Sequence, residues 1–304
     1  MKFVKPGSVF AATIVTWFGI QTYVIGQPAN PRQVRQPTGP TAPPAHTANL
    51  IRAPFQLTPQ EKAHVDQVLA AWEKHTQKIK TFTCNFTRWN YDPAFAHPQY
   101  KDQPIVVNEG EIRYATPDKG TFRVDRVQHL NTTTGQYEDV KDEQGEHWVC
   151  NGKTIWEHDD KNKQVIERPI PSELQGQAIR KTPLPFLFGS KAEDLKKRYF
   201  LRVVTPKEFA EKEIWLDAFP RGQADAANFQ RAILRLDRST FQPAAMRIYD
   251  PAGAYKSYGF SKIAVNNKLD LAREYFLPPR PPFGWRRIVE TPPEATASRP
   301  AAPR

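Results

Sequence analysis

The chain has 304 residues, of which 39% are hydrophobic and 25% charged, and its formal net charge at pH 7 is +11. A positive charge of this size indicates a nucleic-acid partner only when it is concentrated on the folded part of a protein. More than half of the excess lies in the two terminal regions, outside residues 55–285, so we predict no nucleic-acid partner.

The first 26 residues have the order of a secretory signal peptide. Lys2 and Lys5 precede an uncharged run that ends at Gly26, and Val24 and Gly26 occupy the two positions that a signal peptidase reads. We expect cleavage after Gly26 and export to the periplasm or cell envelope. An uncleaved anchor that contacts the membrane is the alternative, because the run approaches the ~18 residues at which a span becomes possible.

Two proline-rich regions flank the part of the chain that we expect to fold. Residues 27–54 contain seven prolines among Gln, Thr, Ala and Arg, and residues 286–304 are similar. Neither region can bury enough apolar surface to fold, so we predict a disordered linker and a disordered tail. Residues 55–285 are then one β-rich domain.

This domain opens with a predicted helix. Thr58-Pro59-Gln60-Glu61 is a capping box with proline at the first helical position. The apolar residues that follow are spaced for one helix face, and they are Val65, Val68, Leu69, Trp72 and Ile79. The stripe predicts core packing and indicates no function by itself.

After the helix the apolar period changes from 3.6 to 2. Phe82, Cys84 and Phe86 alternate with polar residues, as in a half-buried strand. Further predicted strands lie at 109–114, 120–125, 164–167, 199–204, 213–216, 232–237, 244–249 and 257–260. We predict an α+β fold: a strongly curved antiparallel sheet that forms an incomplete β-barrel, with the N-terminal helix and a central helical lid on its concave side.

Two central segments are the most informative. Asn151-Gly152 lies between two apolar runs and predicts a type I′ hairpin turn with positive φ at both residues. Residues 183–189 are uncharged and rich in Leu, Phe and Pro. We expect this second segment to lie against the sheet as the lid.

The sequence offers no catalytic constellation. It contains no Gly-x-Ser-x-Gly, no His-Glu-x-x-His, no phosphate-binding glycine loop and no Cys-x-x-Cys. We therefore predict a protein that is not an enzyme and that uses neither a metal nor a cofactor. Export would permit a disulfide between the two cysteines, Cys84 and Cys150, and their spacing leaves the disulfide and two free thiols equally open.

Aromatic and aliphatic residues on the predicted concave face are the candidate ligand site. Acyl chains suit such a surface, because apolar transfer is worth about 0.8 kcal/mol per buried CH₂. A filled core built from the same side chains is the alternative, since periodicity cannot separate filled from hollow. The predicted cavity and lid residues are Phe86, Ile112, Tyr114, Phe122, Val124, Trp148, Phe186, Leu187 and Phe188.

Several segments resemble, in the right order, the periplasmic outer-membrane lipoprotein carrier family and related lipid-binding exported proteins. The most specific is 151–159, which is similar to the family's Asp-Gly-Lys-Thr-Leu-Trp hairpin. Further matches are Gly110 to Tyr114 with Pro117, residues 183–188 as the family's lid segment, 248–253 and 276–279. The chain also resembles a carrier-like branch from planctomycete-type bacteria, a likeness that leaves function open. The family resemblance implies an incomplete antiparallel barrel whose apolar cavity, plugged by helices, accepts lipoprotein acyl chains.

One position departs from the family pattern. In the carriers an arginine before the proline that corresponds to Pro117 latches the lid, whereas this chain has Thr116. The resemblance therefore does not imply lid-controlled delivery to a receptor. We expect an exported, monomeric carrier or sensor that binds a lipid or lipoprotein acyl chain in an apolar cavity. The alternative is a cell-envelope module that binds another protein and has a filled core.

Overall fold

The computed structural model divides between Ala48 and Asn49 into two units, and every residue described below belongs to the second. The described ranges are 51–140, 145–172, 175–176, 191–267 and 273–290. The predicted signal peptide and the predicted lid residues Phe186, Leu187 and Phe188 lie outside these ranges. Within them, no helix combines the length and the apolar character that a membrane span requires.

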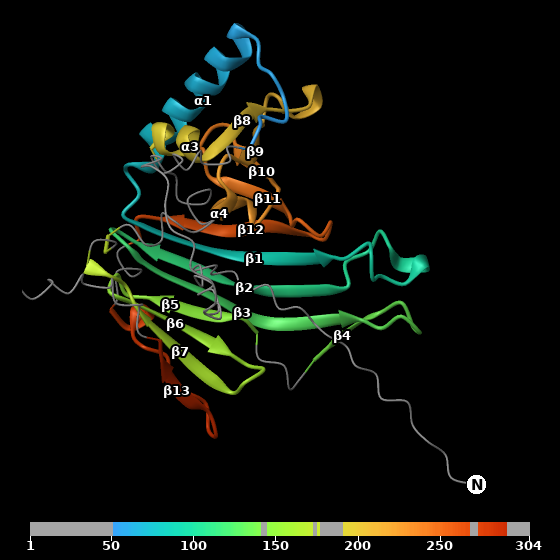
Figure 1. The fold of residues 1–304 in the computed structure, drawn as a ribbon, viewed down its shortest axis with the longest axis vertical. Helices are drawn as coiled ribbons and strands as arrows, with labels where there is room; N and C mark the ends of the chain where they lie inside the picture. Colours follow the sequence, from blue (N-terminus) through green and yellow to red (C-terminus); the bar gives the residue numbers. More distant parts are fainter. Residues whose placement is uncertain (1–50, 141–144, 173–174, 177–190, 268–272, 291–304) are drawn as a thin grey trace, which may run out of the picture. The chain divides into compact units, whose positions relative to one another are not determined.

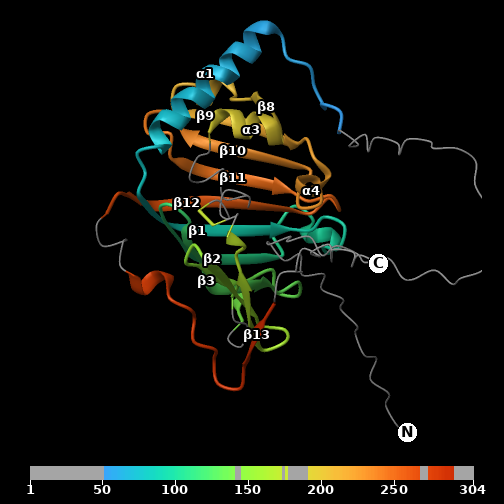
Figure 2. The ribbon, with the colours of Figure 1, turned by 60° about the vertical axis from the view of Figure 1, so that its left-hand side comes forward.

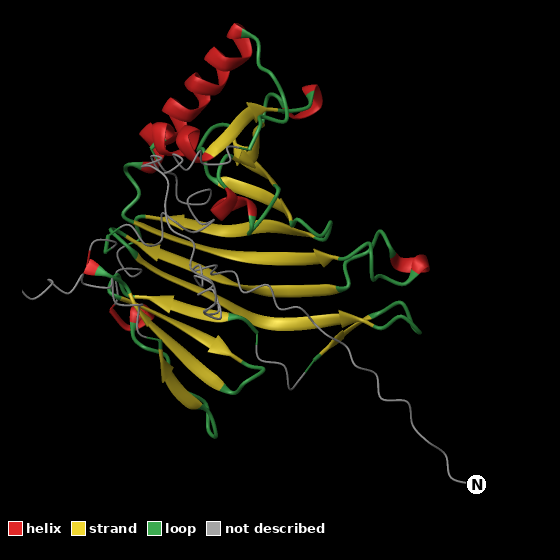
Figure 3. Cartoon of the chain, viewed as in Figure 1, coloured by secondary structure: helices red, strands yellow, loops and turns green. Residues whose placement is uncertain are grey.

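Helices form a small part of the described chain (Figure 3). They are α1 (Pro59–Thr76), α3 (Ala192–Arg198) and α4 (Gln223–Ala226), with 3₁₀ turns η1 (Pro98–Tyr100), η4 (Lys207–Phe209) and η6 (Arg273–Phe276). The predicted capping box of α1 is confirmed: Thr58 Oγ1 accepts the Glu61 N–H, and the Glu61 carboxylate accepts the Thr58 N–H at 2.8 Å. Four of the five predicted stripe residues are buried in α1, while Ile79 lies beyond the end of the helix.

The strands join in one 13-stranded sheet within the described part of the chain (Figure 1). They are β1 (Thr81–Tyr91), β2 (Val106–Ala115), β3 (Lys119–Leu130), β4 (Tyr137–Asp139), β5 (His147–Cys150), β6 (Thr154–Asp159), β7 (Gln164–Pro169), β8 (Tyr199–Val203), β9 (Glu213–Pro220), β10 (Arg231–Asp237), β11 (Pro243–Tyr249), β12 (Tyr255–Val265) and β13 (Arg286–Val289). Their order is β13-β7-β6-β5-β3-β2-β1-β12-β11-β10-β9-β8, with β4 beside β3.

The sheet is open, with β8 at one end of the strand order and β13 at the other. Helix α1 contacts β8 and α3, and both views show α1 and α3 at the β8 end of the sheet (Figures 1 and 2). The predicted α+β class is confirmed: the sheet dominates and few helices accompany it within the described residues. The strongly curved sheet and the incomplete barrel stay predictions, because the sheet is open. Most of the predicted lid falls on residues 177–190, which are outside the described ranges.

The last strand differs from the sequence-based expectation. Composition assigns residues from 286 onward to a disordered tail, yet Arg286–Val289 form β13. This strand pairs with β7 in parallel, while the other described strand pairs are antiparallel. Trp285 explains the attachment, because its side chain packs against Val149, Trp156 and Val165.

The predicted hairpin between β5 and β6 is confirmed, but its turn is of another type. Of the two residues Asn151 and Gly152, only Gly152 has a positive φ, of 89°. Instead the Asn151 side-chain oxygen accepts the backbone N–H groups of Lys153 and Thr154, both at 2.9 Å. The turn therefore centres on Gly152 and Lys153, with glycine in the first central position as in a type II′ turn.

Candidate functional site: the apolar face of the sheet

Strand register brings the six described candidate residues to one face of the sheet. Cys84 of β1 pairs with Ile112 of β2, Ile112 pairs with Phe122 of β3, and Phe122 pairs with Trp148 of β5. Since side chains in one row of a sheet point to the same side, these residues share a face. We call it the inner face and define it by Phe86, Ile112, Tyr114, Phe122, Val124 and Trp148. Each of the six is at most 8% exposed.

Aromatic rings form the centre of the inner face. The rings of Phe86 and Phe122 stack with centroids 4.7 Å apart, and those of Phe122 and Trp148 with centroids 6.1 Å apart. Tyr258 of β12 continues the row, its centroid 6.1 Å from that of Phe86. The predicted residues are therefore in contact, as an acyl-binding wall and a filled core would both require.

Gly110 makes room for this stack. It pairs with Phe86, next to an irregularity in the pairing of β2 with β3. A Cβ at Gly110 would lie 2.0 Å from the Arg123 carbonyl oxygen and 2.8 Å from Phe86 Cζ. The Phe86 ring and the neighbouring strand thus occupy the space of a side chain, and only glycine fits there.

A polar cluster interrupts the inner face at one end. Arg88, 7% exposed, donates from Nε to Asn108 Oδ1 at 3.0 Å and from Nη1 to Glu146 Oε2 at 2.7 Å. Its guanidinium also lies 5.7 Å from the centre of the Phe122 ring. This cluster was not predicted from the sequence. The sequence did contain a pattern that indicates a buried arginine, because Arg88 continues the two-residue period of Phe82, Cys84 and Phe86 on the apolar face.

The polar cluster holds buried charge. Burial alone would lower the pKa of Arg88, but Tyr258 and Glu146 outweigh it and raise that pKa. Burial raises the pKa of Tyr258 to about 12, against the opposing effect of Arg88. Lys256 lies two residues before Tyr258 on β12, opposite Asn90 of β1. Its pKa falls to about 8, first through burial and then through the nearby Arg88.

The two cysteines are both free and buried. Cys84 is on β1 and Cys150 on β5, with β2 and β3 between their strands. The Cys150 thiol donates to the Asp118 carbonyl oxygen at 3.3 Å. Burial raises the pKa of both thiols, that of Cys150 to about 12, so the structure contains two inert thiols and no disulfide between them.

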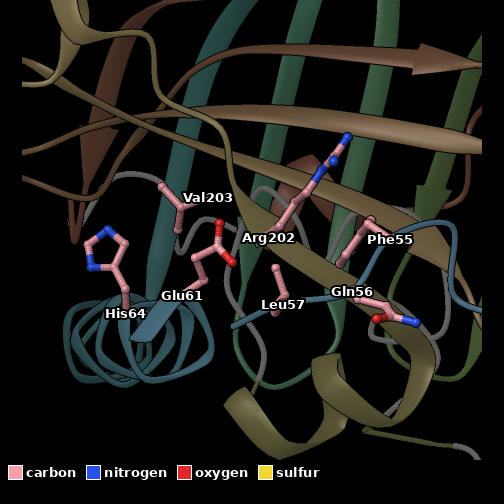
Figure 4. A pocket seen from close by; sticks show the side chains of 7 residues that line it. All are labelled: Phe55, Gln56, Leu57, Glu61, His64, Arg202 and Val203. Carbon is pink, nitrogen blue, oxygen red and sulfur yellow. The ribbon is translucent and has the colours of Figure 1, made fainter. Parts of the chain in front are cut away.

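A small cavity lies near the β8 end of the sheet (Figure 4). Its volume is about 100 Å³, and its lining comprises Phe55, Gln56, Leu57, Glu61, His64, Arg202 and Val203. Ligand pockets usually enclose roughly 300–1,000 Å³. This cavity is too small for an acyl chain, and we assign no ligand to it.

The opposite face of β8 to β12 carries alternating arginine and aromatic side chains. Arg231 lies 5.6 Å from the ring centres of both Phe219 and Tyr249, and Arg247 lies 5.1 Å from that of Tyr255. We call this the outer face and define it by Arg202, Trp215, Phe219, Arg231, Arg235, Arg247, Tyr249 and Tyr255. Two carboxylates support it: Asp217, which is fully buried, pairs with Arg202 and Arg231, and Glu213 pairs with Arg235.

Comparison with known proteins places the chain in a family. The profile of the family described as outer membrane lipoprotein carrier protein LolA matches residues 107–274. The chain belongs to the LolA family. The LolA match includes Ile112, Tyr114, Phe122, Val124 and Trp148, whereas Phe86 precedes it.

Two LolA relatives are named outer-membrane lipoprotein carrier protein. One, from Dechloromonas aromatica, is 34% identical over 131 residues, which are 43% of this chain and 56% of the relative. Another, from Alcanivorax borkumensis, is 30% identical over 134 residues, which are 43% of this chain and 56% of the relative. The chain thus spans little more than half the length of these relatives.

Solved structures give weaker similarities. A conserved protein from Thermus thermophilus is 11% identical, with a TM-score of 0.38 over 74% of this chain and 99% of that one. The complex of MucA and MucB from Pseudomonas aeruginosa gives 14% identity and a TM-score of 0.36 over 71% of this chain and 61% of that one. A LolA-superfamily protein from Nitrosomonas europaea gives 11% identity and a TM-score of 0.30 over 69% and 97%.

Proposed function

We propose that this LolA-family protein is an exported, monomeric, non-enzymatic carrier or sensor that holds an acyl chain of a lipid or lipoprotein against the inner face. The structural basis of the proposal is the aromatic row of Phe86, Phe122 and Trp148, flanked by Ile112, and membership of the LolA family favours an acyl-binding wall over a filled core. Family membership supports carriage over catalysis, because the named relatives are lipoprotein carriers.

In this proposal the sheet curves into an incomplete barrel, and Phe186, Leu187 and Phe188 cover the inner face as a lid. Binding would separate these apolar groups from the wall and replace them with an acyl chain. Each buried CH₂ contributes about 0.8 kcal/mol, so a long chain gains enough to remain bound in water and a short one does not.

Photolabelling tests this proposal. The purified full chain is incubated with a palmitic acid analogue that carries a diazirine in the middle of its chain, irradiated, digested and sequenced by mass spectrometry. We expect label on peptides that contain Phe122, Trp148 or Phe186. Excess unlabelled palmitate should remove that label, and octanoate should not.

A matched comparison uses the two sides of β3. Val124→Trp adds bulk to the inner face, and we expect it to reduce labelling several-fold, because the added ring occupies the site. Asp125→Asn, the next residue on the opposite side of the strand, should leave labelling unchanged. No label on the inner face, together with no lipid in native mass spectra of the gently purified protein, would count against acyl binding.

The site of action in the periplasm or cell envelope is part of the same proposal. It is supported by the signal-like pattern of residues 1–26. Cell fractionation with N-terminal sequencing should find the mature protein outside the cytoplasm, beginning at Gln27. A chain that retains Met1 and sediments with membranes would contradict cleavage after Gly26 and support an uncleaved membrane anchor.

The outer face favours a second candidate, an interaction module that binds an acidic envelope protein. Interface hot spots are enriched in Trp, Tyr and Arg, and the outer face combines all three. Its arginines outnumber the two supporting carboxylates, so it would complement an acidic partner.

Crosslinking in cells separates this candidate from acyl carriage. A photoreactive amino acid at Tyr255 should give a protein adduct, and Arg247→Glu should abolish that adduct by reversing the local charge. Lys161→Glu, an exposed change in the β6–β7 turn, serves as the control. An adduct that survives Arg247→Glu and disappears with Lys161→Glu would refute the assignment to the outer face.

A further inference from the structure

One end of the inner face carries more positive than negative charge. The aromatic row passes from Phe122 and Phe86 to Tyr258, and Arg88 and Lys256 follow on the same side of β1 and β12. Glu146 is the carboxylate that pairs with Arg88. Two cations thus stand beside one paired carboxylate, at a point where an apolar surface ends.

Lys256 is the cation without a partner. Among the described residues, no carboxylate lies within ion-pairing distance of its ammonium group and no hydrogen bond from it is formed. In the sheet, Lys256 pairs with Asn90 of β1 on one side and with Ile248 of β11 on the other. As a whole residue Lys256 is intermediate between buried and exposed, and its ammonium group lies deep enough for burial to lower its pKa.

The other acidic group near Lys256 is committed elsewhere. Asp250, in the turn between β11 and β12, acts on Lys256 electrostatically. Its Oδ1 accepts the backbone N–H groups of Ala252 and Ala254, at 2.9 and 3.0 Å. Asp250 therefore stabilises its own turn, and the charge of Lys256 is left uncompensated by a direct contact.

We propose that Lys256 binds the anionic end group of an acyl ligand, a carboxylate or a phosphate, while the ligand's chain lies along Phe86 and Phe122. An amphipathic ligand needs an apolar surface that ends at a charge of opposite sign, and this arrangement supplies both. The inference rests on the proposed function, because it names the ligand class for the same inner face.

Two pairs of fluorescent probes test the inference on the purified full chain. The first pair is dansylaminoundecanoic acid and its methyl ester, which share chain and fluorophore. The second pair is a lysophosphatidic acid and a monoacylglycerol that carry the same nitrobenzoxadiazole-labelled chain. Each pair differs in one anionic group, so the first reports preference for a carboxylate and the second for a phosphate.

We expect the protein to bind the anionic member of at least one pair about tenfold more tightly, the size of one charge-assisted contact. Lys256→Met should bring that member to the affinity of its neutral counterpart and leave the neutral probe unchanged. Lys256→Arg, which keeps the charge, should retain the preference. Lys262→Met, an exposed change on the same strand, should behave as the unmodified protein.

The possible failures are distinct. If both members of each pair bind equally well, or if Lys256→Met keeps the preference, the role of Lys256 is refuted and acyl carriage stands. If no probe binds, the proposed function fails and the inference fails with it. A lower melting temperature of Lys256→Met with an unchanged preference would assign Lys256 a structural role only.

Discussion

The inner and outer faces of the sheet use aromatic side chains in opposite ways. On the inner face Phe86, Phe122 and Trp148 stack on one another and are at most 2% exposed. On the outer face each aromatic ring contacts an arginine, and Arg202, Arg231 and Arg235 keep 35% of their side-chain surface exposed. The same residue types therefore build an apolar layer on one side and a polar, partly solvated layer on the other.

The two sides of one sheet therefore differ in their exposure to water. The inner face excludes water, and any ligand there must be apolar over most of its length. The outer face satisfies its arginines with carboxylates and rings while leaving them reachable. A substitution should therefore cost far more stability on the inner face than on the outer one.

The sharpest test compares one phenylalanine from each face. Phe122→Ala removes a ring that is 0% exposed and lies between two others, so we expect a loss of about 4 kcal/mol. Phe219→Ala removes a half-buried ring under two arginines, and we expect about 1 kcal/mol. Urea unfolding of both variants measures the difference. Equal losses would mean that the two faces do not differ in packing.

Gly110→Ala tests the close approach behind the stack. Because its Cβ would lie 2.0 Å from a backbone oxygen, β2 and β3 must shift, and we expect a loss of about 3 kcal/mol. Gly222→Ala is the matched control, since nothing lies within 4 Å of a Cβ there, and it should change stability by less than about 1 kcal/mol. Similar midpoints for the two variants would show that β2 and β3 can separate at low cost.

An arginine from each face gives a smaller contrast. Arg88→Met leaves Glu146 without its ion-pair partner, and because Glu146 remains 27% exposed we expect a loss of about 2 kcal/mol. Arg247→Met removes an exposed contact with Tyr255 and should cost less than about 1 kcal/mol. Adding Glu146→Gln to Arg88→Met should recover part of the loss. No recovery would place the cost in packing rather than in the unpaired charge.

The smallest effect concerns pH and the side of β5 and β6 away from the inner face. His147 and His158 lie there with ring centroids 4.6 Å apart. Burial, then His158 and Arg123, lowers the pKa of His147 from 6.5 to about 4. Between these two values His147 is protonated in the unfolded chain and neutral in the folded one. The free energy of unfolding therefore falls as the pH drops from 6.5 towards 4. His147→Gln should flatten the melting temperature over this interval, and an unchanged slope would exclude His147 as its source.

Local sequence patterns predicted most of the strands and the residues that share the inner face. The two-residue period of β1 identified Phe86, and the apolar runs around Asn151-Gly152 identified β5, β6 and Trp148. The predicted type I′ turn was wrong. Asn151 does not adopt a positive φ, and its side chain accepts hydrogen bonds from the backbone of Lys153 and Thr154. Lys256 was missed because the predicted strand began at residue 257, whereas β12 begins at Tyr255.

Features that depend on distant partners could not be read locally. β13 consists of two arginines and two aliphatic residues after a proline-rich stretch, so its strand character comes from β7 and not from its own pattern. The polar cluster likewise joins β1 to Glu146, 58 residues away. The lid residues Phe186, Leu187 and Phe188 remain a prediction.

β13 has a consequence for the order of folding. Arg287 pairs with Glu167, which lies 120 residues earlier in the chain. Until the last residues of the domain are available, β7 presents unpaired backbone groups along an edge that can join another chain. Contacts of such long sequence separation form late. The sheet edge therefore stays open to self-association until the C-terminal strand docks, and a chain cut before Arg286 would keep that edge permanently.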